Sequence, residues 1–222
     1  MNGCHASIDA RLPYWNDYRQ LIGQLPQDAF PDTGALNNLL PAAAVNFSGQ
    51  PIRFVAASLL GTVPYEKHIF ETGQVSTREN NWHDLFNALV WCRLPRLKMA
   101  MNAMHYERLD EEQSGRRGHL RDAVTLLDES GVLVVGTRRE ALQALAAKDW
   151  GRIFLQQRDA WRDDLRVVVC GHALLEKFLN PYKALTAHAL LLLLDDDIPI
   201  SPGDLELPVL DATVSGLSLI HI

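Results

Sequence analysis

Four polar residues, Asn80, His83, Asp84 and Asn87, are spaced so that a helix would place them on one face. At about 100° per residue they fall within an arc of roughly 100°, opposite the apolar residues of the same segment. Solvated helix faces normally carry Lys, Glu, Gln and Arg, which are good helix formers. A face built from Asn, His and Asp instead favours contacts of defined geometry, such as those in a binding or catalytic site.

The chemistry of this face centres on His83. An imidazole can act as a general base or as a metal ligand, with Asp84 as a ligand or orienting group and Asn87 positioning a substrate oxygen. Asn80 and the flanking Arg78 are assigned to substrate binding. A structural alternative stays open, in which polar residues cap the helix and His83 bonds a backbone carbonyl.

A second candidate follows a Val-rich stretch at residues 166–170, which predicts a strand that Gly171 turns directly into a helix. His172 and Glu176 are four residues apart on that helix, as suits a pair of metal ligands or a base with its orienting carboxylate. In the structural alternative, His172 caps the helix and Glu176 pairs with an exposed basic residue. Cys170 lies beside the helix N-terminus, so a Cys–His nucleophile is the weaker option.

Arg121 and Asp122 form a third candidate, because Arg121 and the arginines before it could hold a phosphate or carboxylate. The alternative is a solvated loop. The following segment predicts a β-hairpin over about residues 122–135, with its turn at residues 128–131, where Asp comes first and Gly last.

Most of the elements that position these residues are expected to be helices. Helices are expected over about residues 81–91 and 96–106, and another over about 182–194 that carries His188 in the core. Together they predict an α+β fold in which a small sheet, made of the hairpin and the strand at 166–170, is packed by helices. The length is that of a single domain, expected over residues 1–216.

The composition of the chain disfavours several classes of function. Of the 222 residues, 47% are hydrophobic and 22% are charged, as in a globular protein, and the net charge of −6 disfavours nucleic acid as a partner. The longest apolar run is too short to span a bilayer, and three scattered cysteines suit a reducing compartment, so we expect a cytoplasmic protein that does not bind membranes. Phosphate-binding Gly-rich loops, the GxSxG elbow and CxxC pairs do not occur.

The last six residues, 217–222, match the in-frame translation of a transposon-end adapter used in preparing sequencing libraries. We expect them to be non-native. They carry no functional argument.

Several segments in order resemble one protein family. They are residues 65–66, 77–78, 82–91, 95–96, 121–123, 126–131 and 171–177. The chain is similar over about residues 36–194 to the bacterial family catalogued as domain of unknown function 3025. The resemblance implies no reaction and no catalytic residue.

The polar residues around His83 and His172 favour an enzyme, with a small molecule as the expected ligand. The reaction expected is hydrolysis of a small-molecule ester or phosphoester in a pocket of His83, Asp84 and Asn87, with His172 and Glu176 opposite. One divalent metal ion would assist. The alternative is a non-catalytic binding or adaptor protein whose polar clusters are structural, with Trp and Arg residues near 82–96 at the interface.

Overall fold

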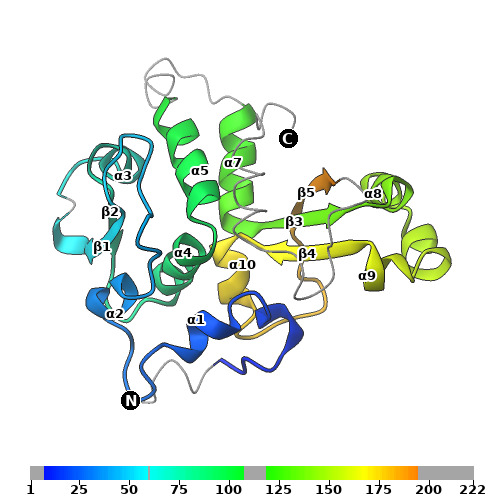
Figure 1. Ribbon diagram of the computed structural model, residues 1–222, viewed down its shortest axis with the longest axis horizontal. Helices are drawn as coiled ribbons and strands as arrows, with labels where there is room; N and C mark the ends of the chain where they lie inside the picture. Colours follow the sequence, from blue (N-terminus) through cyan, green and yellow to red (C-terminus); the bar gives the residue numbers. More distant parts are fainter. Residues whose placement is uncertain (1–7, 60, 108–118, 195–222) are drawn as a thin grey trace.

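The structure is a computed structural model that describes residues 8–59, 61–107 and 119–194 of the chain (Figure 1). Four helices pack against one another at its centre: α4 (Trp82–Arg93), α5 (Pro95–Glu107), α7 (His119–Ser130) and α10 (His172–Lys177). A two-stranded sheet lies on one side of these helices and a three-stranded sheet on the other. The arrangement confirms the predicted helix-rich α+β fold.

The smaller sheet is a parallel pair with a helical connection. Its elements are β1 (Arg53–Ala56), η3 (Ala57–Leu59), α3 (Tyr65–Thr72) and β2 (Gln74–Thr77). Gly73 ends α3 with a φ of 71°, and a β-carbon there would lie 2.3 Å from the Pro51 carbonyl oxygen. This crossover places α3 beside α5, so that the first turn of α3 reaches the centre of the molecule.

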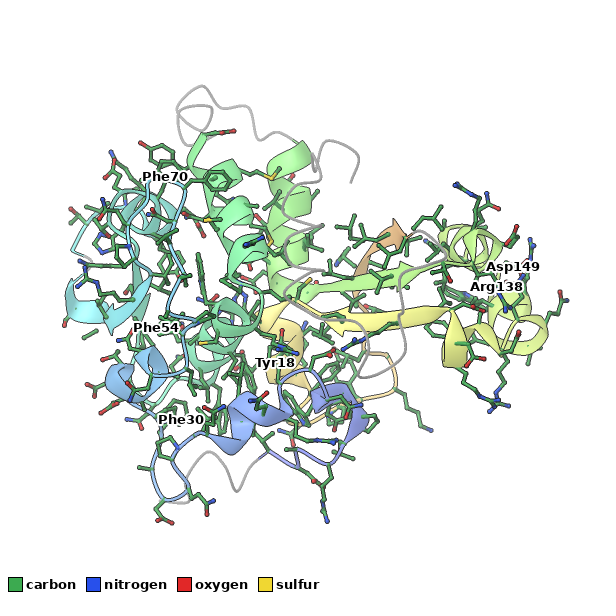
Figure 2. The ribbon with its side chains drawn as sticks, viewed as in Figure 1. Tyr18, Phe30, Phe54, Phe70, Arg138 and Asp149 are labelled. Carbon is green, nitrogen blue, oxygen red and sulfur yellow. The ribbon has the colours of Figure 1, made fainter. Side chains whose placement is uncertain are left out.

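The larger sheet has the order β4-β3-β5, with β3 antiparallel to β4 and parallel to β5. Its strands are β3 (Gly131–Gly136), β4 (Leu165–Val169) and β5 (His188–Leu193). Between β3 and β4 the chain forms α8 (Arg139–Ala146), η4 (Arg152–Gln156) and α9 (Ala160–Asp163). These three lie at the end of the sheet away from the central helices, where Figure 2 labels Arg138 and Asp149.

Two predictions about this region are wrong. The expected hairpin at 122–135 is helix α7 followed directly by strand β3, and Val124 and Leu127 are buried while Leu126 is exposed, as helical spacing requires. The expected helix at 182–194 contains strand β5, because a short apolar run suits a strand as well as a helix. His188 is exposed there, and its Nδ1 lies 2.9 Å from the Ser130 hydroxyl. The strand expected at 166–170 is confirmed as β4 within one residue.

The N-terminal segment closes the core beneath α4 and α10. It contains η2 (Pro13–Trp15), α1 (Arg19–Gly23) and, farther on, α2 (Thr33–Asn37). Trp15 stacks on Phe86 of α4 with ring centroids 5.5 Å apart, and both are fully buried. The Tyr18 hydroxyl donates a hydrogen bond of 2.6 Å to the Val169 carbonyl (Figure 2). This segment therefore holds the end of β4 in place, immediately before α10.

Two glycines bring the end of α7 against the start of α10. A β-carbon on Gly171 would lie 2.3 Å from the Gly131 backbone nitrogen, so the two backbones meet more closely than side chains permit. The Gly171 and Cys170 amides donate hydrogen bonds of 2.9 and 3.1 Å to the Gly131 carbonyl. The last turn of α7 and the first turn of α10 are consequently adjacent.

Within the described ranges, no helix combines the length and apolar character needed to cross a bilayer. Residues 217–222 lie outside the described residues, so their adapter origin stays a prediction. The same is true of the domain limits 1–216.

Candidate functional site

The two histidines singled out by the sequence are in contact. His83 of α4 and His172 of α10 are 89 residues apart in the chain, yet their Nε2 atoms are 2.9 Å apart. Their ring centroids are 4.4 Å apart with the planes at 74°, so the imidazoles converge rather than stack. On its other side, His83 Nδ1 lies 3.2 Å from the Glu176 carboxylate, one turn along α10. Three predicted site residues thus form one chain of polar contacts.

The start of α4 explains where His83 sits. Asn81 is the N-cap, and its side chain accepts a hydrogen bond of 3.0 Å from the Asp84 amide, so the capping alternative is right for this residue. The Asp84 carboxylate binds Arg78 through Nη2 at 2.7 Å, Nε at 3.0 Å and the backbone amide at 2.6 Å. Burial alone would raise the pKa of Asp84, but the bonds from Arg78 outweigh it and the pKa falls below its ordinary value. Asp84 therefore anchors the loop that enters α4.

Two acidic residues at the end of α7 face His172. His172 Nδ1 lies 3.7 Å from the Asp128 carboxylate, and Nε2 lies 3.8 Å from that of Glu129. The C-terminal end of a helix dipole disfavours negative charge, so carboxylates in this turn require compensation from outside the helix. A lysine supplies it for Asp128.

That lysine is Lys98 of α5, whose side chain is only 6% exposed. Its Nζ lies 2.5 Å from the Asp128 carboxylate. Burial opposes ionisation of Asp128, yet the nearby positive charge of Lys98 dominates together with His172 and holds the pKa of Asp128 well below its usual value. Asp128 is therefore a carboxylate at neutral pH, between Lys98 and His172.

The two histidines and the acids Asp84, Asp128 and Glu129 line a polar cavity of about 410 Å³, whereas Glu176 and Lys98 are not part of its lining. Besides the two histidines, its wall includes Tyr65, Arg78, Asn87 and Glu129. Asn87 Nδ2 donates a hydrogen bond of 2.9 Å to the Tyr65 hydroxyl, while the Asn87 Oδ1 is buried and has no partner among the described residues. Burial and the nearby acids raise the pKa of Tyr65 far above 10, which keeps the phenol protonated. Asn87 therefore orients the Tyr65 hydroxyl, while its own side-chain oxygen stays enclosed.

Glu66 on α3 is another acid in the cavity wall, and its pKa is shifted in the opposite direction from that of Asp128. Its carboxyl is enclosed, and this burial, with the charge of Asp128, raises its pKa to about 7. Asn102 of α5 donates a hydrogen bond of 2.6 Å to the Glu66 carboxylate, which limits the shift. Glu66 can therefore exchange a proton near neutral pH.

Other predicted residues lie elsewhere. Asn80 precedes α4 in a turn with a φ of 53° and is exposed, so it does not share the helix face expected for it. Asp122 is exposed near the start of α7, seven residues and therefore about 10 Å from Glu129. Arg121 belongs to α7, but its side chain lies outside the described part of the structure. Neither Asn80 nor Asp122 lines the cavity.

Cys170 does not supply a nucleophile. It is fully buried, and burial raises the pKa of its thiol far above the ordinary value. Its Sγ lies 3.9 Å from the Leu127 carbonyl oxygen. The thiolate that a Cys–His pair needs is therefore strongly disfavoured.

The sequence reasoning missed Glu129, Asp128 and Glu66. The first two were placed in a hairpin turn, where their types needed no further explanation. Their signal is visible once residues 119–130 form a helix, because two acids in its last turn oppose the dipole. Glu66 carries no comparable signal, because an acid in the first turn of a helix is ordinary.

Comparison with known proteins identifies a family but no reaction. A family model described as "Protein of unknown function (DUF3025)" matches residues 52–218. No curated protein and no solved structure matches the chain. The match covers most of the sequence, including every residue of the cavity described above, and it confirms the resemblance drawn from the sequence motifs. The chain belongs to the DUF3025 family.

Proposed function

We propose that this protein is a hydrolase that cleaves ester or phosphoester bonds of small molecules in the cavity between α4, α7 and α10. One observation carries the proposal. Two histidines meet in the cavity wall, and each has a carboxylate near its other ring nitrogen, Glu176 for His83 and Asp128 for His172. A base held by an orienting carboxylate is the usual arrangement for activating water or another nucleophile.

His83 is the better base of the two. The Glu176 carboxylate accepts the Nδ1 proton, which makes Nε2 the basic nitrogen of His83. This atom accepts a hydrogen bond from His172 Nε2 at 2.9 Å, and a water that takes the place of His172 there would give its proton to it. The hydroxide formed from that water adds to the ester carbon or phosphorus, the bond to the leaving oxygen breaks, and the proton held by His83 passes to that oxygen, so that the alcohol departs. The Tyr65 hydroxyl, which accepts a hydrogen bond from Asn87 Nδ2, donates its own proton to a substrate oxygen and so positions it.

The charge of the cavity bears on the substrate. Carboxylates of Asp84, Asp128 and Glu129 face it, whereas Arg78 is the basic residue in its wall besides the histidines. Such a field repels a dianionic phosphate, so neutral esters are the preferred substrates unless a cation is bound. Arg78, whose side chain is 58% exposed, is the group placed to meet an anionic substrate.

The test is turnover of chromogenic substrates, p-nitrophenyl carboxylic esters and bis(p-nitrophenyl) phosphate, by the full chain. His83→Gln should lower kcat/KM by roughly 10²–10⁴-fold, the usual contribution of a general base, and Glu176→Gln should lower kcat with less effect on KM. His188→Gln, an exposed histidine outside the cavity, is the matched control. Equal activity in His83→Gln and His188→Gln would overturn the proposal.

A binding or adaptor function is the second candidate, and one observation favours it. Trp150, Phe154 and Leu155 are exposed to 55%, 49% and 81% at or beside η4. By contrast, the interface expected near residues 82–96 is weakened because Trp91 is buried. A binding function predicts no turnover by the wild type, and loss of partner capture in Leu155→Glu but not in His83→Gln.

We further propose that the protein acts in the cytoplasm. Its two described cysteines, Cys92 and Cys170, are free and buried, which suits a reducing compartment. Fractionation of the native host, with the chain detected by antibody, tests this.

A further inference from the structure

We propose that His83, His172 and Glu129 bind one divalent transition-metal ion, best matched by Zn²⁺, through the two Nε2 atoms and a carboxylate oxygen. Two imidazoles and one carboxylate are a donor set that catalytic zinc sites use. In the loaded site the ion would replace His83 as the group that activates water, because a ligating Nε2 has no lone pair left to accept a proton. This role of the ion rests on the proposed function, whereas its binding can be measured without any substrate.

The donor atoms already converge. One ligand atom from each of the three residues lies within 4.8 Å of the others. The two Nε2 atoms are 2.9 Å apart, and His172 Nε2 is 3.8 Å from the Glu129 carboxylate. Tetrahedral Zn²⁺ with bonds of about 2.0–2.1 Å needs ligand atoms about 3.3–3.4 Å apart. The two Nε2 atoms would have to move apart by about 0.5 Å and His172 and Glu129 to approach by about as much, while the His83 and Glu129 donors lie within 4.8 Å of each other and would also have to approach.

The outer nitrogens of the imidazoles supply a second argument. Without an ion, one Nε2 must donate its proton to the other, and His172 Nδ1 is then buried with no hydrogen-bond partner among the described residues. An ion on both Nε2 atoms places both protons on Nδ1. His83 then donates to Glu176 at 3.2 Å, and His172 faces Asp128 at 3.7 Å. Ligating histidines in metal sites almost always have such a carboxylate or carbonyl partner.

Charge balance supplies a third argument. Asp84 pairs with Arg78, and Asp128 pairs with Lys98. Within the described residues, the carboxylates of Glu129 and Glu176 form ion pairs with the histidines alone. Two carboxylates that lack a permanent cation match the charge of one divalent ion.

A site with three protein donors leaves one coordination position for water. Binding to the ion lowers the pKa of that water to about 7, so hydroxide forms near neutral pH without a strong base. The cavity beyond the donors is where the ester would lie. The ion would also offset the negative field of the wall, which extends the substrate range toward phosphoesters.

The test is isothermal titration calorimetry, in which Zn²⁺ alone is added to the full chain after a chelator has removed any bound metal. One ion per chain is expected. Glu129→Gln should weaken binding by more than 100-fold, and Glu176→Gln by roughly 10–100-fold, as loss of an outer partner usually does. Glu71→Gln is the matched control, because Glu71 lies outside the cavity and its side chain is 45% exposed, like that of Glu129. Circular dichroism of each variant shows that the fold is retained.

Substitution with Co²⁺ gives a second readout, since tetrahedral Co²⁺ absorbs strongly in the visible range and His172→Asn should abolish that absorption. The proposal is overturned if the wild type binds no stoichiometric ion, or if Glu129→Gln binds as tightly as Glu71→Gln. Its failure differs from failure of the proposed function. Hydrolysis by a wild type that binds no stoichiometric ion refutes the metal site alone, whereas stoichiometric Zn²⁺ without turnover refutes the hydrolase alone.

Discussion

Replacing Glu66 by Gln should stabilise the protein above pH 7 and leave its stability nearly unchanged below pH 4.5. The reason is the enclosed carboxyl of Glu66, whose pKa rises from 4.5 to about 7 because burial and the charge of Asp128 oppose ionisation. Gln is neutral and nearly isosteric, and its side-chain oxygen can still accept the hydrogen bond from Asn102.

The magnitude follows from proton linkage. Below pH 4.5 the Glu66 carboxyl is protonated in both the folded and the unfolded chain. Between pH 4.5 and about 7 only the unfolded chain releases the proton, so the wild type loses about 1.4 kcal/mol of unfolding free energy per pH unit. Above that range both states are ionised, and Glu66→Gln should be more stable by up to about 3 kcal/mol.

Urea denaturation followed by tryptophan fluorescence at pH 4.5, 6 and 8 measures the difference directly. Other groups that titrate are common to both proteins and largely cancel. Glu71→Gln, which replaces an exposed acid on the same helix, is the matched control. A constant offset between Glu66→Gln and the wild type at all three pH values would refute the reasoning.

Three further perturbations test the packing around the site. Lys98→Met leaves the Asp128 carboxylate buried without its cation and should cost roughly 3–5 kcal/mol in urea denaturation, so a loss below 1 kcal/mol would contradict the ion pair. Gly171→Ala places a β-carbon 2.3 Å from the facing glycine nitrogen and should cost about 3 kcal/mol, whereas Gly23→Ala, with nothing within 4 Å, should not lower the melting temperature. The Cys170 thiol, whose pKa burial raises, should react with a disulfide reagent at pH 8 only after unfolding, and rapid labelling of the native chain would show it is accessible.

The sequence indicated the two halves of the site because each has a strong local pattern. The Asn81 cap and the apolar side of α4 specify that helix, and the Val run with Gly171 specifies the strand-to-helix turn before His172. Both signals depend on neighbours in the chain. Whether the two histidines meet depends on the packing of α4 against α10. The polar residues of each segment indicated only that its histidine could take part in a contact.

The wrong hairpin prediction and the failure to place Glu129 in the site have the same cause. The pattern around residues 122–135 contains the turn residues Asp128 and Gly131, and these outweighed the helical spacing of Val124 and Leu127 in the prediction. Gly131 serves close backbone contact rather than a turn, which a single sequence does not distinguish. Once α7 was misassigned, Glu129 could not be placed beside His172.

The 89-residue separation of the paired histidines also determines when the site can exist during folding. The turns of helix α4 rest on contacts between near neighbours in the chain, whereas the place of His172 beside it rests on the pairing of β4 with β3 and on the contact of the two facing glycines. A growing or partly unfolded chain thus presents its imidazoles as separate weak ligands. Capture of an ion or a substrate at both imidazoles therefore reports that these long-range contacts have formed, and ligand binding stabilises only the state that contains them.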